Sequence, residues 1–213
     1  MFTTPPLFRP TAVTLEGAHV RLEPMATSHA EGLLAAGHFP ALWEVTVQPP
    51  LDSAEAVEAY IASSLANGAA GTEVPFVICR RDTGEVIGST RIMDIAPAHR
   101  RVEIGGSWVT PAHQRSPVNT ETKLLLLTYL FETLGAYRVQ FKTDARNQAS
   151  QRALSGIGAR CEGTLRRHMV VRDGFVRDSV YYGITDDDWP QVKTLLHTRL
   201  RRLLDPTQRV GLE

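Results

Sequence analysis

The chain has 213 residues, in which 23 Lys and Arg residues balance 23 Asp and Glu residues. The resulting net charge of zero excludes a strong overall field, so we expect neither a nucleic acid nor an anionic membrane as a partner. The length suits one sizeable hydrophobic core. No stretch is apolar enough to cross a bilayer, and the N-terminal segment lacks a signal-peptide pattern, which predicts a cytoplasmic protein.

Apolar residues recur with a strand period in some segments and a helical period in others. Residues 1–18 are rich in proline near their start and predict an extended N-terminal arm. In chain order, the patterns predict a strand at 19–23, helices from 27 and at 54–68, a hairpin of 75–79 with 86–92, a strand at 101–109, a helix ending at 135, a strand at 137–141, a helix at 147–157, a hairpin of 164–171 with 176–184, and a final helix from about 186.

The order of these elements predicts an α/β fold. Strand, helix, strand and helix follow one another from Arg101 to Ile157, which implies a parallel strand pair with a right-handed crossover. The hairpins on either side make the expected sheet mixed and mostly antiparallel, with helices flanking it. We expect a single domain over residues 19–204 and a C-terminal tail at 205–213.

The two cysteines, Cys79 and Cys161, do not have the spacing of metal ligands, and no metal is expected. Cys79 lies in an apolar run typical of a strand. We therefore interpret both cysteines as buried free thiols.

The segment "AHQRSPVNTETKLLLL" joins the strand ending at Val109 to a leucine-rich helix. A helix N-terminus presents unpaired backbone N–H groups and the positive end of its dipole, which together bind anions. The segment adds donors close to the helix start, namely His113, Gln114, Arg115, Ser116, Val118, Asn119 and Thr120. A diphosphate cradle and a plain capped turn both fit this pattern.

The preceding strand contains Gly105 and Gly106, which predict a β-bulge. A bulge spreads a strand from its neighbour and leaves backbone N–H and C=O groups free for the amides of a ligand. A free strand edge, a diphosphate loop and a buried helix together match an acyl-CoA, because its pantetheine carries amides and its nucleotide carries phosphates.

The residues that carry this pattern resemble the GNAT superfamily of acyl-CoA-dependent N-acetyltransferases, and within it the ribosomal-protein N-terminal (alanine) acetyltransferase branch. The resemblance covers residues 19–189 and is most specific in "VEIGGSWVTPAHQRSPVNTETKLLLL", "RVQFKTDARNQASQRALSGIGARCEGTLRRH" and "DGFVRDSVYYGITDDDWP". It implies the GNAT fold, with about seven strands and a splayed central parallel pair. The phosphate loop of the superfamily usually reads Gln/Arg-x-x-Gly-x-Gly/Ala, whereas this loop contains no glycine.

The resemblance also implies which residues bind acetyl-CoA or another short acyl-CoA. Trp108 and Val109 would pair through their backbones with pantetheine. Asn147 would hydrogen-bond the pantetheine arm or the thioester region, and Arg152 would approach the phosphates. The alternative role of Asn147 is a helix cap, which is compatible with both. The diphosphate would be held by Gln114, Arg115, Ser116, Val118, Asn119 and Thr120.

Acyl transfer requires a base, because an ammonium with a pKa of about 10 must lose a proton before its nitrogen attacks. Glu103 precedes the two glycines and is the candidate, directly or through a water molecule. The alternative is a surface carboxylate paired with Arg101 or Arg91. Strict alternation would place Ser107 on the same side of the strand as Glu103, unless the bulge reverses the order.

The departing thiolate calls for a hydrogen-bond donor. Many GNAT enzymes have a tyrosine seven residues after the asparagine of the last motif, but this sequence has Leu154 there. Ser150, which matches the Asn-x-x-Ser of the ribosomal branch, is therefore the candidate near the sulfur, and its alternative is an exposed helical serine. Glu162 and His168 are candidates to touch the acceptor.

These observations predict an N-acyltransferase that moves an acetyl or another short acyl group to a primary amine by direct attack. The acceptor is expected to be a small molecule or a protein N-terminus, because the first two helices carry no readable specificity code. The resemblance is compatible with a homodimer. A catalytically inactive acyl-CoA-binding module of the same fold is the main alternative, and a nucleotide-binding domain without thioester chemistry ranks below it.

Overall fold

The computed structural model describes residues 7–205. Eight strands form one sheet in the order β1-β2-β3-β4-β5-β6-β8-β7. The strands are β1 (Leu15–Glu16), β2 (Val20–Pro24), β3 (Val74–Arg80), β4 (Val86–Ala96), β5 (Arg101–Val109), β6 (Arg138–Asp144), β7 (Arg160–Val170) and β8 (Val176–Thr185). The helices are α1 (Ala30–Gly37), α2 (Ala54–Ala69), α3 (Pro117–Thr128), α4 (Gln148–Gly156) and α5 (Trp189–Leu204).

The sheet is mixed, as predicted. Every neighbouring pair of strands is antiparallel except β5 and β6, which are parallel. The predicted count of about seven strands was low by one. Part of the expected arm, Leu15–Glu16, pairs with Leu22 and Arg21 of β2 as a short edge strand. A strand of two residues is too short to show an alternating pattern, so the sequence could not reveal it.

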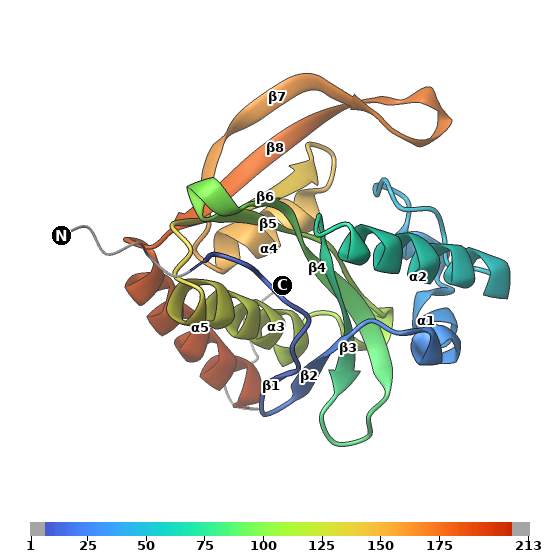
Figure 1. Ribbon diagram of the computed structural model, residues 1–213, viewed down its shortest axis with the longest axis horizontal. Coiled ribbons are helices and arrows are strands. Elements are labelled where there is room, and N and C mark those ends of the chain that lie inside the picture. The colour runs from blue at the N-terminus through green and yellow to red at the C-terminus, as the bar shows by residue number, and fades with distance from the viewer. Residues whose placement is uncertain (1–6, 206–213) are drawn as a thin grey trace.

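Helices cover both faces of the sheet (Figure 1). One hydrophobic cluster joins the sheet to α3, α4 and α5, through residues that include Leu126, Leu154 and Leu196. A second cluster lies under α1 and α2 and includes Leu33, Val57 and Trp108. The β7–β8 hairpin extends beyond these layers, and its tip lies above the connection between α1 and α2 (Figure 1).

The glycine pair of β5 forms the predicted bulge. Ser89 and Arg91 of β4 pair with Trp108 and Gly105, so β5 carries one extra residue between these pairs. Gly106 adopts a φ of 57°, a left-handed conformation that glycine tolerates without steric cost. The extra residue reverses the alternation, because Trp108 packs under α1 and α2, whereas Ser107 meets Lys123 of α3. Ser107 therefore does not share the face of Glu103.

The helix predicted to end at Gly135 does so, because α3 continues into a π-helical turn at Tyr129–Thr133 and Gly135 follows with a φ of 68°. One further expectation, about the cysteines, needed correction. Cys79 is buried as predicted, but Cys161 is exposed. Cys161 lies on β7, an edge strand whose residues are nearly all exposed, and its position at the sheet edge could not be read from composition. Within residues 7–205, no helix is long and apolar enough to span a membrane.

Candidate functional site

The parallel strands β5 and β6 open into a V. They pair only from Arg101 to Glu103 and from Arg138 to Gln140, and beyond these residues they share no pairing. The remaining residues of β5, including Trp108 and Val109, therefore turn one backbone edge toward the opening. In open α/β sheets, ligands bind at the carboxyl ends of strands where the connections diverge. The V provides such a place, and its free amide edge suits a ligand that itself contains amides.

Helix α3 begins at the carboxyl end of β5. Ser116 is its N-cap, and its hydroxyl accepts a hydrogen bond from the Val118 N–H at 3.3 Å. Pro117 occupies the first turn, where its missing N–H costs nothing. Thr120 and Val118 are buried and Asn119 is half-buried. Apart from the Val118 N–H, which the Ser116 hydroxyl caps, the N–H groups at the start of a helix have no partner within it, so they can receive a diphosphate.

The loop before α3 contains no glycine, yet one of its residues adopts the left-handed backbone conformation that glycine usually occupies. Arg115 has a φ of 54°, which places it in the left-handed region. Gln114 donates from Nε2 to the Val109 carbonyl at 3.1 Å, and Ser116 donates from Oγ to the His113 carbonyl at 2.6 Å. These two bonds hold the loop, and the exposed Arg115 side chain forms no hydrogen bond or ion pair with any other residue of 7–205. The donor set therefore suits the phosphates of an acyl-CoA.

Helix α4 begins at the carboxyl end of β6, on the other side of the V. Asn147 is its N-cap, and its Oδ1 accepts from the Ser150 N–H at 2.9 Å. The cap leaves the amide group of Asn147 available as a donor. Ser150 is half-buried in the first turn, and Arg152 is exposed. The fold thus brings the starts of α3 and α4, which are far apart in sequence, to the same end of the parallel pair.

Glu103 lies at the vertex of the V, in the last pair that β5 forms with β6. Its side chain is only 3% exposed. Gln140 donates from Nε2 to Oε2 at 3.1 Å, and the Nζ of Lys142 lies 3.5 Å from Oε1. The alternative of a surface ion pair was wrong, because Arg91 pairs with Glu73 and Arg101 pairs with Asp94.

Strand β8 adds polar side chains that the sequence analysis missed. Lys142 stands opposite Tyr181 across the sheet, and Arg177 and Ser179 follow on the same face by alternation. Burial, reinforced by the nearby Glu103 carboxylate, raises the pKa of the Tyr181 phenol, so it remains protonated at neutral pH. The sequence analysis also missed Gln140 and Lys142, although their alternation with Val139 and Phe141 was a signal that could have found them. Joining them to β8, however, required the strand register.

The two candidates on β7 have different surroundings. His168 contacts Ser179 through Nδ1 at 3.1 Å, and its ring lies 5.8 Å from that of Tyr181. His168 therefore joins a set of polar side chains on one face of the sheet, which we call the polar face. Its other members are Glu103, Gln140, Lys142, Arg177, Ser179 and Tyr181. Glu162 instead forms an ion pair with Arg138. A pocket of 390 Å³ lies along this part of the hairpin and borders the polar face at Tyr181; it is lined by Glu162, Gly163, Thr164, Leu165 and Tyr181.

The tip of the β7–β8 hairpin contacts two other loops. Arg172 donates to the Trp43 carbonyl in the connection between α1 and α2. The guanidinium carbon of Arg146 lies 3.6 Å from the ring centre of Phe175, so the tip also contacts the loop before α4. In Figure 1 the hairpin extends beyond the layers, with its tip above the connection between α1 and α2. The two contacts therefore connect the hairpin tip to the loops before α2 and α4.

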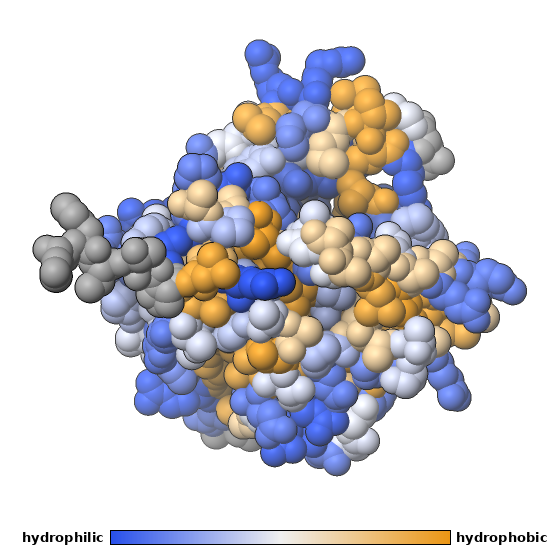
Figure 2. Space-filling model, in the orientation of Figure 1, coloured by the Kyte–Doolittle hydropathy of each residue, from blue (hydrophilic) through white to orange (hydrophobic). Residues whose placement is uncertain are grey.

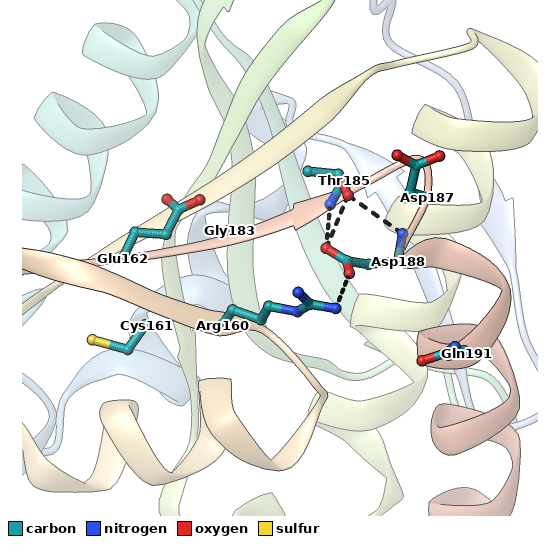
Figure 3. Close-up of a pocket in the computed structure, with 8 residues that line it drawn as sticks. All are labelled: Arg160, Cys161, Glu162, Gly183, Thr185, Asp187, Asp188 and Gln191. Carbon is teal, nitrogen blue, oxygen red and sulfur yellow. Dashed lines mark hydrogen bonds and ion pairs between the residues drawn. The ribbon is translucent and has the colours of Figure 1, made fainter.

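A larger pocket of 490 Å³ lies elsewhere (Figure 3). Its lining residues come from β7, β8 and the start of α5, and an ion pair between Arg160 and Asp188 crosses it at 2.5 Å. Glu162 and Gly183, at its edge, lie beside Arg138 at the amino end of β6. This pocket is therefore at the opposite end of the parallel pair from α3 and α4, and it is not the candidate site.

Comparisons with known proteins agree with this geometry. The model of the GNAT acetyltransferase domain matches residues 19–160. A relative named as the uncharacterized N-acetyltransferase YoaA of Bacillus subtilis (strain 168) is 33% identical over 144 residues, which cover 66% of this chain and 80% of YoaA.

Solved structures also match. A GCN5-related N-acetyltransferase from Brucella melitensis has a TM-score of 0.86 at 28% identity, covering 97% of this chain and 92% of that one. Mycobacterium smegmatis RimJ, solved in complex with CoA-disulfide, shares the fold with a TM-score of 0.74 at 24% identity, covering 88% of this chain and 95% of RimJ. The chain belongs to the GNAT family of acetyltransferases, and it is an acyl-CoA-dependent N-acetyltransferase.

Proposed function

We propose that the enzyme transfers an acetyl group from acetyl-CoA to a primary amine by direct attack in a ternary complex, with Glu103 as the base. The observation that carries the proposal is the position of a buried carboxylate at the vertex of the V. In the reaction, Glu103 takes a proton from the ammonium, directly or through water. The amine nitrogen then bonds to the acyl carbon, and the carbon–sulfur bond breaks to release the CoA thiolate.

The proposed roles of the other residues follow from their places around the V. Trp108 and Val109 would bind pantetheine through the free backbone edge of β5. The half-buried Ser150 would donate its hydroxyl to the leaving thiolate, and Asn147 would hydrogen-bond the pantetheine arm beside it. The diphosphate would lie against the start of α3, at Gln114, Arg115, Ser116, Val118, Asn119 and Thr120, with Arg152 near the phosphates.

Acetyl-CoA, or another short acyl-CoA, is the proposed donor, and no metal takes part in the proposed reaction. RimJ was solved with a CoA derivative, which supports a CoA site in this fold. The proposed acceptor is the amine of a small molecule or of a protein N-terminus. We further propose that the enzyme works in the cytoplasm, since its exposed free Cys161 thiol suits a reducing compartment.

A homodimer is part of the proposal. Figure 2 shows an apolar area on the β7–β8 hairpin, where Leu165 and Val170 are 50% and 72% exposed. Exposed apolar residues along an edge strand favour pairing with another chain. Light scattering coupled to gel filtration would give twice the monomer mass for a dimer, whereas a mass of about 23.5 kDa would contradict it.

Replacing Glu103 by Gln tests the proposed base. The amide keeps the size of the side chain but cannot take the proton, so we expect kcat to fall by at least about 100-fold. The dissociation constant for acetyl-CoA should stay within about twofold, because the side chain lies outside the proposed diphosphate site. Thiol release and calorimetric titration measure the two quantities.

Glu85, an exposed carboxylate in the turn before β4, provides the control Glu85→Gln, which should match the unmodified enzyme. An unchanged kcat in Glu103→Gln would contradict the role of Glu103. Binding of acetyl-CoA by the unmodified protein without thiol release would instead favour an inactive acyl-CoA-binding module.

A further inference from the structure

We propose that Arg177 is a receptor for an anionic group of the acceptor, so that the acceptor is an amine that also carries a carboxylate or a phosphate. The inference rests on the proposed function and narrows its acceptor class. Three observations support it: the terminal nitrogens of Arg177 have no partner, the neighbouring charged side chains are already paired, and Arg177 lies on the same face of the sheet as Tyr181.

Arg177 is buried, yet the end of its side chain has no partner. The residue is 6% exposed, and its Nε donates to the Ser179 hydroxyl at 3.0 Å. Its two terminal nitrogens form no hydrogen bond or ion pair with any other residue of 7–205. Neither nitrogen is sealed from solvent, so both open to accessible space. A planar guanidinium fork in this state suits a carboxylate or phosphate.

The other charges on this face are already paired. Glu103 faces Lys142, and the Asp144 carboxylate receives Arg146 at 2.8 Å. Arg177 therefore adds one positive charge that no residue within 4.0 Å compensates in the part of the chain described. Burial lowers the pKa of Arg177, although a guanidinium stays charged at neutral pH. The carboxylates of Asp144 and Glu103 partly oppose this effect of burial, but neither forms an ion pair with Arg177, and a substrate anion would supply that partner.

The position of Arg177 also fits an acceptor contact. Arg177, Ser179 and Tyr181 alternate along β8, and Tyr181 stands opposite Lys142, which contacts the proposed base. An acceptor whose amine lies near Glu103 can therefore extend along the same face toward Arg177. His168 of β7 also contacts Ser179, so the acceptor would lie along β8 beside this histidine. An unmodified protein N-terminus with uncharged first residues would leave Arg177 without an anion.

The test measures thiol release from acetyl-CoA with matched pairs of amines. The pairs are free amino acids and their amides, and phosphoethanolamine and ethanolamine; a peptide with an uncharged N-terminal segment completes the panel. We expect at least one anionic amine to show a kcat/KM at least 10-fold above that of its neutral counterpart. Turnover of amides or of the peptide as efficient as that of the anionic amines would overturn the inference and leave the proposed function intact. Absence of thiol release with every amine would overturn both.

Substitution assigns the preference to one residue. In Arg177→Gln, KM for the anionic amine should rise at least 10-fold, while the dissociation constant for acetyl-CoA stays unchanged. Arg166→Gln, at an exposed arginine of the same hairpin, is the matched control and should keep the original KM. Equal losses for charged and neutral amines in Arg177→Gln would contradict the role of Arg177. The matched pairs measured with the unmodified enzyme decide the acceptor class even if this variant fails to fold.

Discussion

At the scale of one residue, the burial of Lys123 makes the free energy of unfolding depend on pH. It lies on α3, it is 4% exposed, and its Nζ donates to the Ser107 hydroxyl at 2.7 Å. Among residues 7–205, no carboxylate lies within 4.0 Å of it. Burial lowers the pKa of Lys123 to about 7, well below its ordinary value of 10.5. The unfolded chain therefore binds one more proton than the folded chain between these two pH values.

From this difference, the free energy of unfolding should rise with pH between about 7 and 10, by up to about 1.4 kcal/mol per pH unit. In Lys123→Met this contribution disappears, because the variant has no proton to lose at that position. Urea denaturation at several pH values in this window compares the two proteins. Lys193→Met removes an exposed lysine and should keep the original slope. If the free energy of unfolding rose equally with pH in Lys123→Met and in the unmodified protein, Lys123 would not be the source of the pH dependence.

At the scale of elements, α3 connects the edge of the sheet to the proposed diphosphate site. Glu121 is 5% exposed, and its carboxylate accepts hydrogen bonds from the backbone N–H groups of Ala18, His19 and Val20 at 2.8–2.9 Å. These bonds join the turn between β1 and β2 to the helix. The sequence predicted an extended arm up to residue 18, and in the structure the end of that segment is hydrogen-bonded to α3.

Glu121→Gln should lower the free energy of unfolding by about 2–3 kcal/mol. The amide keeps one acceptor oxygen but turns an NH₂ group toward backbone donors. Chemical denaturation measures the loss, and Glu58→Gln on the exposed face of α2 is the control. A loss as small as that of the control would show that these hydrogen bonds contribute little.

Periodicity and turn residues predicted most elements because local sequence determines them. The strand at Arg101–Val109 was predicted with its correct bounds, and Gly105 and Gly106 correctly predicted the bulge. The site was less accessible to prediction, because it depends on which strands become neighbours. Arg177 and Tyr181 join Glu103 only through the register of β6 with β8. The exposure of Cys161 likewise depends on β7 being the sheet edge.

At the scale of the whole molecule, the proposed sites of the two substrates occupy different regions of one opening. The starts of α3 and α4 flank the V at the carboxyl ends of the parallel strands, where the acyl-CoA is proposed to bind. The polar face of β6 and β8 is the proposed site of the acceptor. Glu103 lies where these two regions meet, as direct transfer in a ternary complex requires.

The central claim is that this opening binds an acyl-CoA and transfers its acyl group. We would measure it first by thermal unfolding with acetyl-CoA, succinyl-CoA, CoA, ATP and NAD, followed by thiol release with pooled amines. A ligand at 100 times its dissociation constant adds about 2.7 kcal/mol of stability, which raises Tm by about 5–10 °C in a chain of this size. The account predicts this shift for the CoA compounds but not for ATP or NAD, together with amine-dependent thiol release. Equal shifts with ATP or NAD, or no shift with any CoA compound, would contradict it.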